Sequence, residues 1–368
     1  MPVLVDHRDA GLKGLPARFP LLVTALTLGL ISVGFRPAPT SERGPHSEKA
    51  RHEPNARGRG ADRPSEIPAV GWKDILIRVW KSIGTDRFVA IAAGVTFYSV
   101  LALFPAIAAL VALYGLFADP NTISSHLSSL PGVLPEGALE VVRTEVSRIV
   151  EQGSKSLGLT FLGGLAVAIW SANAGVKALF DALNMVYNEQ ERRGIIKLNA
   201  ISLAFTTGAI LFFLLALSAM VIFPLALGYL GLSSAAEQIA SIARWPALLL
   251  VVGFALAVLY RFGPDRAKPR WRWVTWGSAF AAVSWLAASI LFSYYAAHFG
   301  SYNKTYGSLG AVIGFMVWIW ISMIVILLGA EINAQMEHQT AKDTTTGTPK
   351  PMGLRRAAMA DSLGPGQG

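Results

Sequence analysis

The sequence contains no cysteine and carries little charge for its length. Without cysteine, disulfides, thiol nucleophiles and thiolate metal sites are excluded. Asp, Glu, Lys and Arg make up 15% of the 368 residues, whereas an ordinary soluble domain is about 25% charged. Hydrophobic residues reach 53%, and several apolar runs approach or exceed the length of a membrane-spanning helix. These features together indicate a polytopic membrane protein.

Histidine is also scarce, and no two histidines have the four-residue spacing of paired metal ligands on a helix. No phosphate-binding Gly-Lys loop and no nucleophile elbow occurs in the sequence. We therefore expect no metal site, no cofactor, no catalytic residue and no enzymatic activity. The six histidines are His7, His46, His52, His126, His298 and His338.

Six apolar segments predict the membrane-spanning helices of an all-α bundle. Lys and Arg are dense in 71–87 (four), 189–198 (three) and 261–273 (five), but sparse in 230–245 and 298–307 (one each). Positive charge marks cytoplasmic loops, so we expect both ends of the bundle in the cytoplasm. The formal charge of +9 then reflects these loops, and nucleic acid is not an expected partner. The six segments cover about 88–117, 157–180, 199–229, 246–262, 274–297 and 308–332.

The chain divides into three parts: an N-terminal extension (1–70), a membrane domain (71–338) and a polar tail (339–368). Residues 1–70 are expected to be poorly ordered, and their apolar run 19–35 is a seventh span, a signal segment or an interfacial segment. Residues 36–70 read as a disordered linker, or as a segment that binds anionic lipid headgroups. Within the domain, 71–87 predicts an amphipathic helix on the inner interface, and 136–151 predicts an external one. The tail is expected to be disordered.

A polar stripe runs along the second predicted span and its extension to about residue 190. Its members are separated by four, four, three and four positions, which places them on one helix face. At about 1.5 Å per residue, the stripe is about 22 Å long. Polar groups inside a membrane are costly unless they face other helices or water, so we expect the remaining helices to gather round this face. The stripe consists of Asn173, Lys177, Asp181, Asn184 and Asn188.

Other residues of the predicted spans have two interpretations each. Pro105 should kink the first span, and Gly94 lies on the same helix face; the kink is either a packing feature with a close glycine contact or a functional hinge. Gly310 and Gly314 form a GxxxG pair suited to close helix contact, within the bundle or in a dimer. Tyr98 and Glu331 are expected to line a substrate path together with the stripe.

Three blocks of sequence resemble the YihY/BrkB family of bacterial inner-membrane proteins. They are AAGVTFYSVLALFP (92–105), WSAN with ALFDALNMVYNEQERR (170–193), and YGSLGAVIGFMVWIW with LLGAEINA (306–334), and the resemblance covers about 72–338. It implies a six-helix protein of the cytoplasmic membrane. The family has been described as a virulence or serum-resistance factor and carries an old ribonuclease label.

Two functions from different classes fit the residues. The first is transport or flipping of a polar or lipid-like substrate along the stripe, in which Lys177 and Asp181 neutralise each other and membrane lipids are the partners. The second is an envelope-organising scaffold, in which the stripe joins helices through hydrogen bonds. A membrane-depth cavity lined by stripe residues favours the first function and a dry interior the second. The sequence leaves the substrate, the coupling ion and the oligomeric state open.

Overall fold

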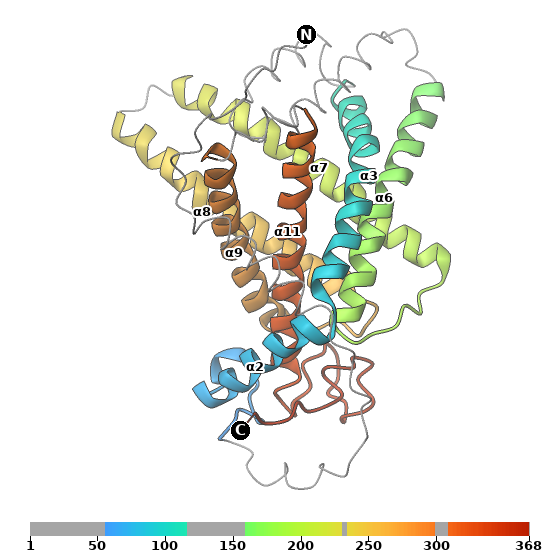
Figure 1. Ribbon diagram of the computed structural model, residues 1–368, viewed down its shortest axis with the longest axis vertical. Coiled ribbons are helices and arrows are strands. Elements are labelled where there is room, and N and C mark those ends of the chain that lie inside the picture. The colour runs from blue at the N-terminus through green and yellow to red at the C-terminus, as the bar shows by residue number, and fades with distance from the viewer. Residues whose placement is uncertain (1–55, 116–158, 230–233, 299–307, 368) are drawn as a thin grey trace, which may run out of the picture.

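The structure, a computed structural model, describes residues 56–115, 159–229, 234–298 and 308–367 (Figure 1). These residues form seven α-helices and no strand apart from one isolated antiparallel bridge between Pro269 and Thr345. The predicted all-α membrane bundle is thus confirmed. The helices are α2 (Ala69–Thr85), α3 (Phe88–Gly115), α6 (Leu159–Val186), α7 (Ile195–Tyr229), α8 (Ser234–Phe262), α9 (Trp271–His298) and α11 (Ser308–Glu337), and a 3-10 turn (Pro64–Glu66) precedes them.

Each predicted span coincides with one of these helices, although the number of crossings is not settled by length and composition alone. Four described helices are long and apolar enough to cross a membrane, in α6, α7, α9 and α11. The helices α2 and α3 meet at a 64° bend and together would make a fifth span. The apolar part of α8, Pro246–Phe262, is shorter. Six crossings with both ends inside therefore stay a prediction.

The centre of the bundle is α11, not the striped helix α6 around which we expected the others to gather. Figure 1 shows α11 between α9 on one side and α3 on the other, and it also packs against α2 and α6. Two side-chain hydrogen bonds join α11 to its neighbours. The Trp320 indole of α11 donates to the Val89 carbonyl of α3 (3.1 Å), and the Tyr260 hydroxyl of α8 donates to the Ile326 carbonyl of α11 (2.7 Å). The helix α6 packs mainly against α3 and α7.

The buried core is concentrated at one end of the bundle, which we call the basic end. This end carries α2, the loops 187–194 and 263–270 and the tail. Core residues come from the last turns of α6, α8 and α11 and the first turns of α3 and α9, for example Phe180, Tyr260 and Val274. Toward the other end, apolar side chains are exposed, including Val167 (65%) and Leu250 (75%). The described helices are therefore tightly packed at the basic end and present apolar surface to lipid beyond it.

The closest helix contact involves glycines that the GxxxG pattern does not include. A Cβ on Gly277 of α9 would lie 2.1 Å from the carbonyl oxygen of Gly329 in α11. Asn333 closes the same contact, because its Oδ1 accepts the Gly277 N–H (2.9 Å) and its amide donates to the Val274 carbonyl (3.3 Å). A Cβ on Gly314, in contrast, would meet nothing within 4 Å. Gly314 is therefore not at a close helix contact among the described residues, and a contact of the Gly310–Gly314 pair elsewhere, for example in a dimer, stays a prediction.

The expected hinge in α3 is also different in the structure. The helix continues through Pro105 to Gly115, so the backbone is not unwound at the proline. A Cβ on Gly94 would meet nothing within 4 Å, and no close helix contact occurs there. The close approach of α3 to α6 lies at Gly175, where a Cβ would lie 3.3 Å from Ala102.

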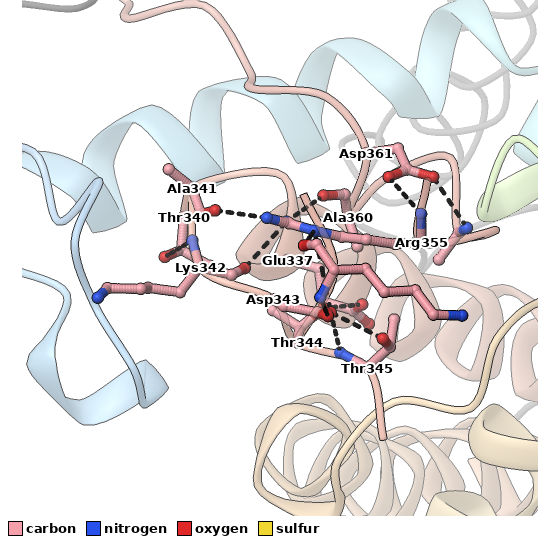
Figure 2. A network of polar contacts seen from close by, with 12 residues as sticks. Glu337, Thr340, Ala341, Lys342, Asp343, Thr344, Thr345, Arg355, Ala360 and Asp361 are labelled. Carbon is pink, nitrogen blue, oxygen red and sulfur yellow. Dashed lines mark hydrogen bonds and ion pairs between the residues drawn. The ribbon is translucent and has the colours of Figure 1, made fainter. Parts of the chain in front are cut away.

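The tail and the last part of the N-terminal extension are packed rather than disordered. Residues 56–68 and 338–367 lie together over the basic end, and Arg59 donates to the carbonyls of Gln339 (3.3 Å) and Gly364 (2.5 Å). In the tail, the buried Arg355 guanidinium donates to the carbonyls of Ala341 (2.7 Å) and Ala360 (2.6 Å), as Figure 2 shows. Because an arginine side chain has five donors in a fixed geometry, Arg355 can order the tail, which has few apolar residues. The apolar run 19–35 and the external helix 136–151 lie outside the described residues.

Candidate functional site

Asn173, the first residue of the polar stripe, forms a hydrogen bond between α6 and α7. Asn173 is almost fully buried, and its Oδ1 accepts a hydrogen bond from the Thr206 hydroxyl of α7 (3.0 Å). Its Nδ2 is buried and has no hydrogen-bond partner among the residues that the structure describes. A buried amide donor without a partner costs about 1–3 kcal/mol. Asn173 therefore holds one free donor inside the bundle.

The next two stripe residues are not paired as we expected. None of the ion pairs in the described residues joins Lys177 to Asp181. The Lys177 ammonium lies 5.4 Å from the ring centroid of Trp170 instead, and Asp181 is exposed. A cation over an indole ring is stabilised by the ring quadrupole. The side chains of Lys177 and Asp181 are thus available on the surface of α6.

The lower end of the stripe is structural. The Asn184 Nδ2 donates to Glu191 (3.1 Å), and its Oδ1 accepts the Asp265 N–H from the loop 263–270 (2.8 Å). Asn188 lies beyond the end of α6 with φ 55°, the left-handed conformation that commonly ends a helix. Asn184 thus joins α6 to its neighbouring loops, and the predicted path role of Asn184 and Asn188 stays a prediction.

Glu331 and Tyr98, the two other predicted path residues, differ in burial. Glu331 is 1% exposed, and its Oε1 accepts a hydrogen bond from the Gln335 amide (2.9 Å). Tyr98 lies on the exposed surface of α3. No described contact joins either residue to Asn173 or Lys177, so a cavity shared by Asn173, Lys177, Tyr98 and Glu331 stays a prediction.

A cleft opens at the basic end, between the loop after α6, the loop 263–270 and the tail. Its volume is about 420 Å³. Glu189 accepts the Ala358 N–H (2.6 Å), and burial raises the pKa of its carboxyl. Asp265 accepts the Arg192 N–H (2.8 Å) and so links the two loops. The lining residues are Asn188, Glu189, Gln190, Arg192, Asp265, Gly353, Leu354, Arg356, Ala357, Ala358 and Asp361.

A buried ion pair joins the loop 263–270 to α11. Its arginine, Arg266, directly follows the cleft residue Asp265 in the sequence. The Arg266 and Glu337 side chains are fully buried and 2.6 Å apart. The Arg266 guanidinium also lies 4.3 Å from the Tyr187 ring centroid, and Thr344 donates to the other Glu337 oxygen (2.8 Å). Burial alone would lower the pKa of Arg266, but the charge and hydrogen bond of Glu337, together with Tyr187 and Glu189, outweigh burial and raise it. Arg266 is therefore charged, and the Glu337 carboxylate stabilises this buried charge.

Comparison with known proteins decides the family of this chain. The model of the virulence factor BrkB family matches residues 79–352. The chain belongs to this family. The ribonuclease-like protein YfkH of Bacillus subtilis is 31% identical over 67% of this chain and 90% of its own length. A UPF0761 membrane protein of Ralstonia nicotianae is 27% identical over 69% of this chain, and one of Neisseria meningitidis serogroup B is 26% identical over 69%.

These similarities place the protein among multi-pass proteins of the bacterial inner membrane. The matched stretches cover 56% and 61% of the Ralstonia and Neisseria relatives, so these proteins contain further sequence that this chain does not match. No solved structure matches the chain. Within the described residues, no three His, Asp or Glu side chains are grouped so that they could hold a metal ion.

Several residues that build these sites carry no signal in the sequence. Thr206 and Asp265 are separated from their asparagine partners by 33 and 81 residues. Arg78 belongs to the expected amphipathic helix, yet it is buried and donates to Gln335 (2.6 Å) and Gln339 (2.7 Å). The family pattern marks α6 and α11 but does not show which side chains meet.

The pH dependence of tail docking is expected to follow His338. Its Nε2 lies 3.3 Å from the Ser362 hydroxyl, and its buried Nδ1 has no partner. Burial, and then the charges of Arg78 and Arg59, lower its pKa from 6.5 to about 4. Above pH 6.5 the ring is neutral whether the tail is docked or released, and docking has its full stability. Between pH 6.5 and 4 the released form binds the proton more readily, so docking weakens by up to about 3 kcal/mol.

Hydrogen exchange of residues 339–367, corrected for the intrinsic effect of pH, measures this change. Protection should fall from pH 7 to pH 5 in the native chain. His338→Gln keeps a polar side chain without a titrating group and should remove most of the fall. If His338→Gln shows the same fall as the native chain, another group controls docking.

Proposed function

We propose that the protein moves a substrate with a polar group, such as a lipid or lipid-like molecule, across the inner membrane. The free Nδ2 of Asn173 carries this proposal. It is a hydrogen-bond donor inside the bundle, between the packed basic end and the part of α6 where Val167 and Trp170 are exposed. Intramembrane polar groups without a structural partner mark substrate pathways. Under this proposal the protein is not an enzyme.

The proposed path is lined by the far part of the stripe rather than by its whole length. Lys177 and Asp181 follow Asn173 toward the basic end and are not paired with each other. Trp170 and Tyr98 add exposed aromatic surface on α6 and α3. A polar headgroup would contact the stripe, and an acyl chain would stay against the apolar helix surfaces. Membrane lipids are accordingly the expected partners.

Asn173→Leu is expected to abolish the movement of substrate while the bundle still folds. Inner-membrane vesicles with the native chain, the variant and no added protein are compared. Lipids on each face are determined with a membrane-impermeant reagent and mass spectrometry, and trapped solutes are profiled alongside. A molecule that changes sides only with the native chain identifies the substrate.

Thr206→Val is the matched control, because it removes the same interhelix hydrogen bond but leaves the Asn173 amide. If Asn173 contacts substrate, this variant keeps transport. If both variants lose it together, Asn173 acts through the bond to Thr206. If neither variant changes the distribution, Asn173 has no part in the movement.

A second function, an envelope-organising scaffold, is favoured by one observation. Asn184 uses both ends of its amide to join Glu191 and the Asp265 N–H. This member of the stripe is thereby committed to structural contacts. An identical distribution of lipids and solutes in all vesicles would favour the scaffold.

A further inference from the structure

The cleft at the basic end lies beside the start of a candidate membrane span, α7. Arg192 lines it and precedes Ile195, the first residue of α7, by three positions, a reach of about 10 Å. Ile195 and Ile196 are 80% and 87% exposed at the start of an apolar candidate span. Such side chains are stable in contact with lipid rather than water. The rim of the cleft at Arg192 therefore lies beside the membrane surface.

The tail contributes an apolar tip to the same cleft. Leu354 lines it and is 67% exposed, and Met352 nearby is also exposed. Exposed Lys350 and Arg356 flank this tip. Basic residues beside exposed apolar ones favour the surface of a membrane. The buried Arg355, fixed by carbonyls of the tail, holds the tip in place.

The cleft presents charged groups of both signs, and Glu189 interacts electrostatically with Arg192 across it. No hydrogen bond or ion pair of the Arg192 and Arg356 guanidinium groups occurs within the described residues. Asp361 accepts the N–H groups of Gly353 (2.8 Å) and Arg355 (2.9 Å). Glu189 and Asp265 each use one oxygen for a backbone N–H, and the described residues provide no donor to the other oxygen.

We propose that this cleft binds the headgroup of an aminophospholipid. Arg192 and Arg356 would bind the phosphate, for which guanidinium geometry is well suited. Glu189 and Asp265 would accept hydrogen bonds from the ammonium group. A ligand with phosphate alone would meet unpaired carboxylate oxygens, and an amine alone would meet two arginines. About 420 Å³ is within the usual size of small-molecule sites.

This inference rests on the proposed function in that it names the substrate class, but binding can be measured without movement. The full chain in detergent is titrated with dioctanoyl phosphatidylethanolamine. Three further probes separate the parts of the ligand. Dioctanoyl phosphatidylglycerol lacks the ammonium group, glycerophosphoethanolamine lacks the chains, and inorganic phosphate is the free anion.

Arg192→Gln with Arg356→Gln should weaken binding of phosphatidylethanolamine about tenfold or more, because both charged contacts to the phosphate would be lost. The matched control, Arg63→Gln with Lys342→Gln, removes two exposed cations of the basic end that do not line the cleft. It should change affinity less than twofold. Equal affinity in the two double variants would overturn the site.

Asp265→Asn tests the ammonium contact, because asparagine can still accept the Arg192 N–H. It should weaken phosphatidylethanolamine and leave phosphatidylglycerol unchanged. If phosphatidylglycerol binds the native chain as tightly as phosphatidylethanolamine, the cleft recognises phosphate only and the proposal is wrong. Inorganic phosphate binding as tightly as the lipid would also overturn it. Loss of transport in Asn173→Leu with no effect of the arginine variants on lipid binding would leave the proposed function standing without this site.

Discussion

Gly277→Ala is expected to lower the free energy of unfolding by about 2–4 kcal/mol, although it adds one methyl group. That methyl would lie 2.1 Å from the Gly329 carbonyl oxygen and 2.4 Å from the Asn333 Oδ1. Both neighbours are held rigidly, one by the backbone of α11 and the other by its hydrogen bonds to α9. The helices would have to move apart and the Gly277 N–H bond would be lost. Thermal unfolding in detergent, followed by size exclusion, measures the effect.

Gly314→Ala is the matched control in the partner helix. A Cβ there meets nothing within 4 Å, and alanine is favoured over glycine inside a helix by about 1 kcal/mol. Its stability should equal or exceed that of the native chain. Equal losses in the two variants would mean that the α9–α11 contact is not as close as described here.

Arg266→Met is expected to destabilise the protein by about 3–5 kcal/mol, because it leaves Glu337 charged and fully buried without its cation. Arg63→Met, which removes an exposed arginine from the same end, should change stability by less than about 0.5 kcal/mol. The double variant Arg266→Met with Glu337→Leu should recover most of the loss, since a buried pair replaced by apolar groups is often neutral.

A double-mutant cycle compares the unfolding in detergent of the native chain, Arg266→Met, Glu337→Leu and the double variant. A large coupling between the two positions supports a direct ion pair that fixes the loop 263–270 to α11. Additive losses would contradict the pair, and would assign the effect of Arg266 to its contact with the Tyr187 ring.

Much of the candidate site depended on contacts that local sequence patterns do not encode. The spacing of Asn173 and Asn184 placed both on one face of α6, which is correct as local geometry. It could not separate them by role, because that depends on Thr206 and Asp265 from other elements. The GxxxG pattern at Gly310 and Gly314 likewise marks a smooth helix face without naming its partner, and the close contact of α11 is at Gly329.

The positions of the membrane helices and the family followed from the sequence by itself. An apolar run long enough to cross a bilayer must satisfy its backbone within the segment, so it forms a helix whatever its neighbours are. The tertiary structure decided that α11 is central, that the tail is packed and that a cleft of mixed charge lies at the basic end. These features depend on side chains that meet across the chain, such as Arg59 with Gln339 and Arg78 with Gln335, separated by 280 and 257 residues. Buried polar contacts of this kind have no periodicity, and only the packing of the helices brings them together.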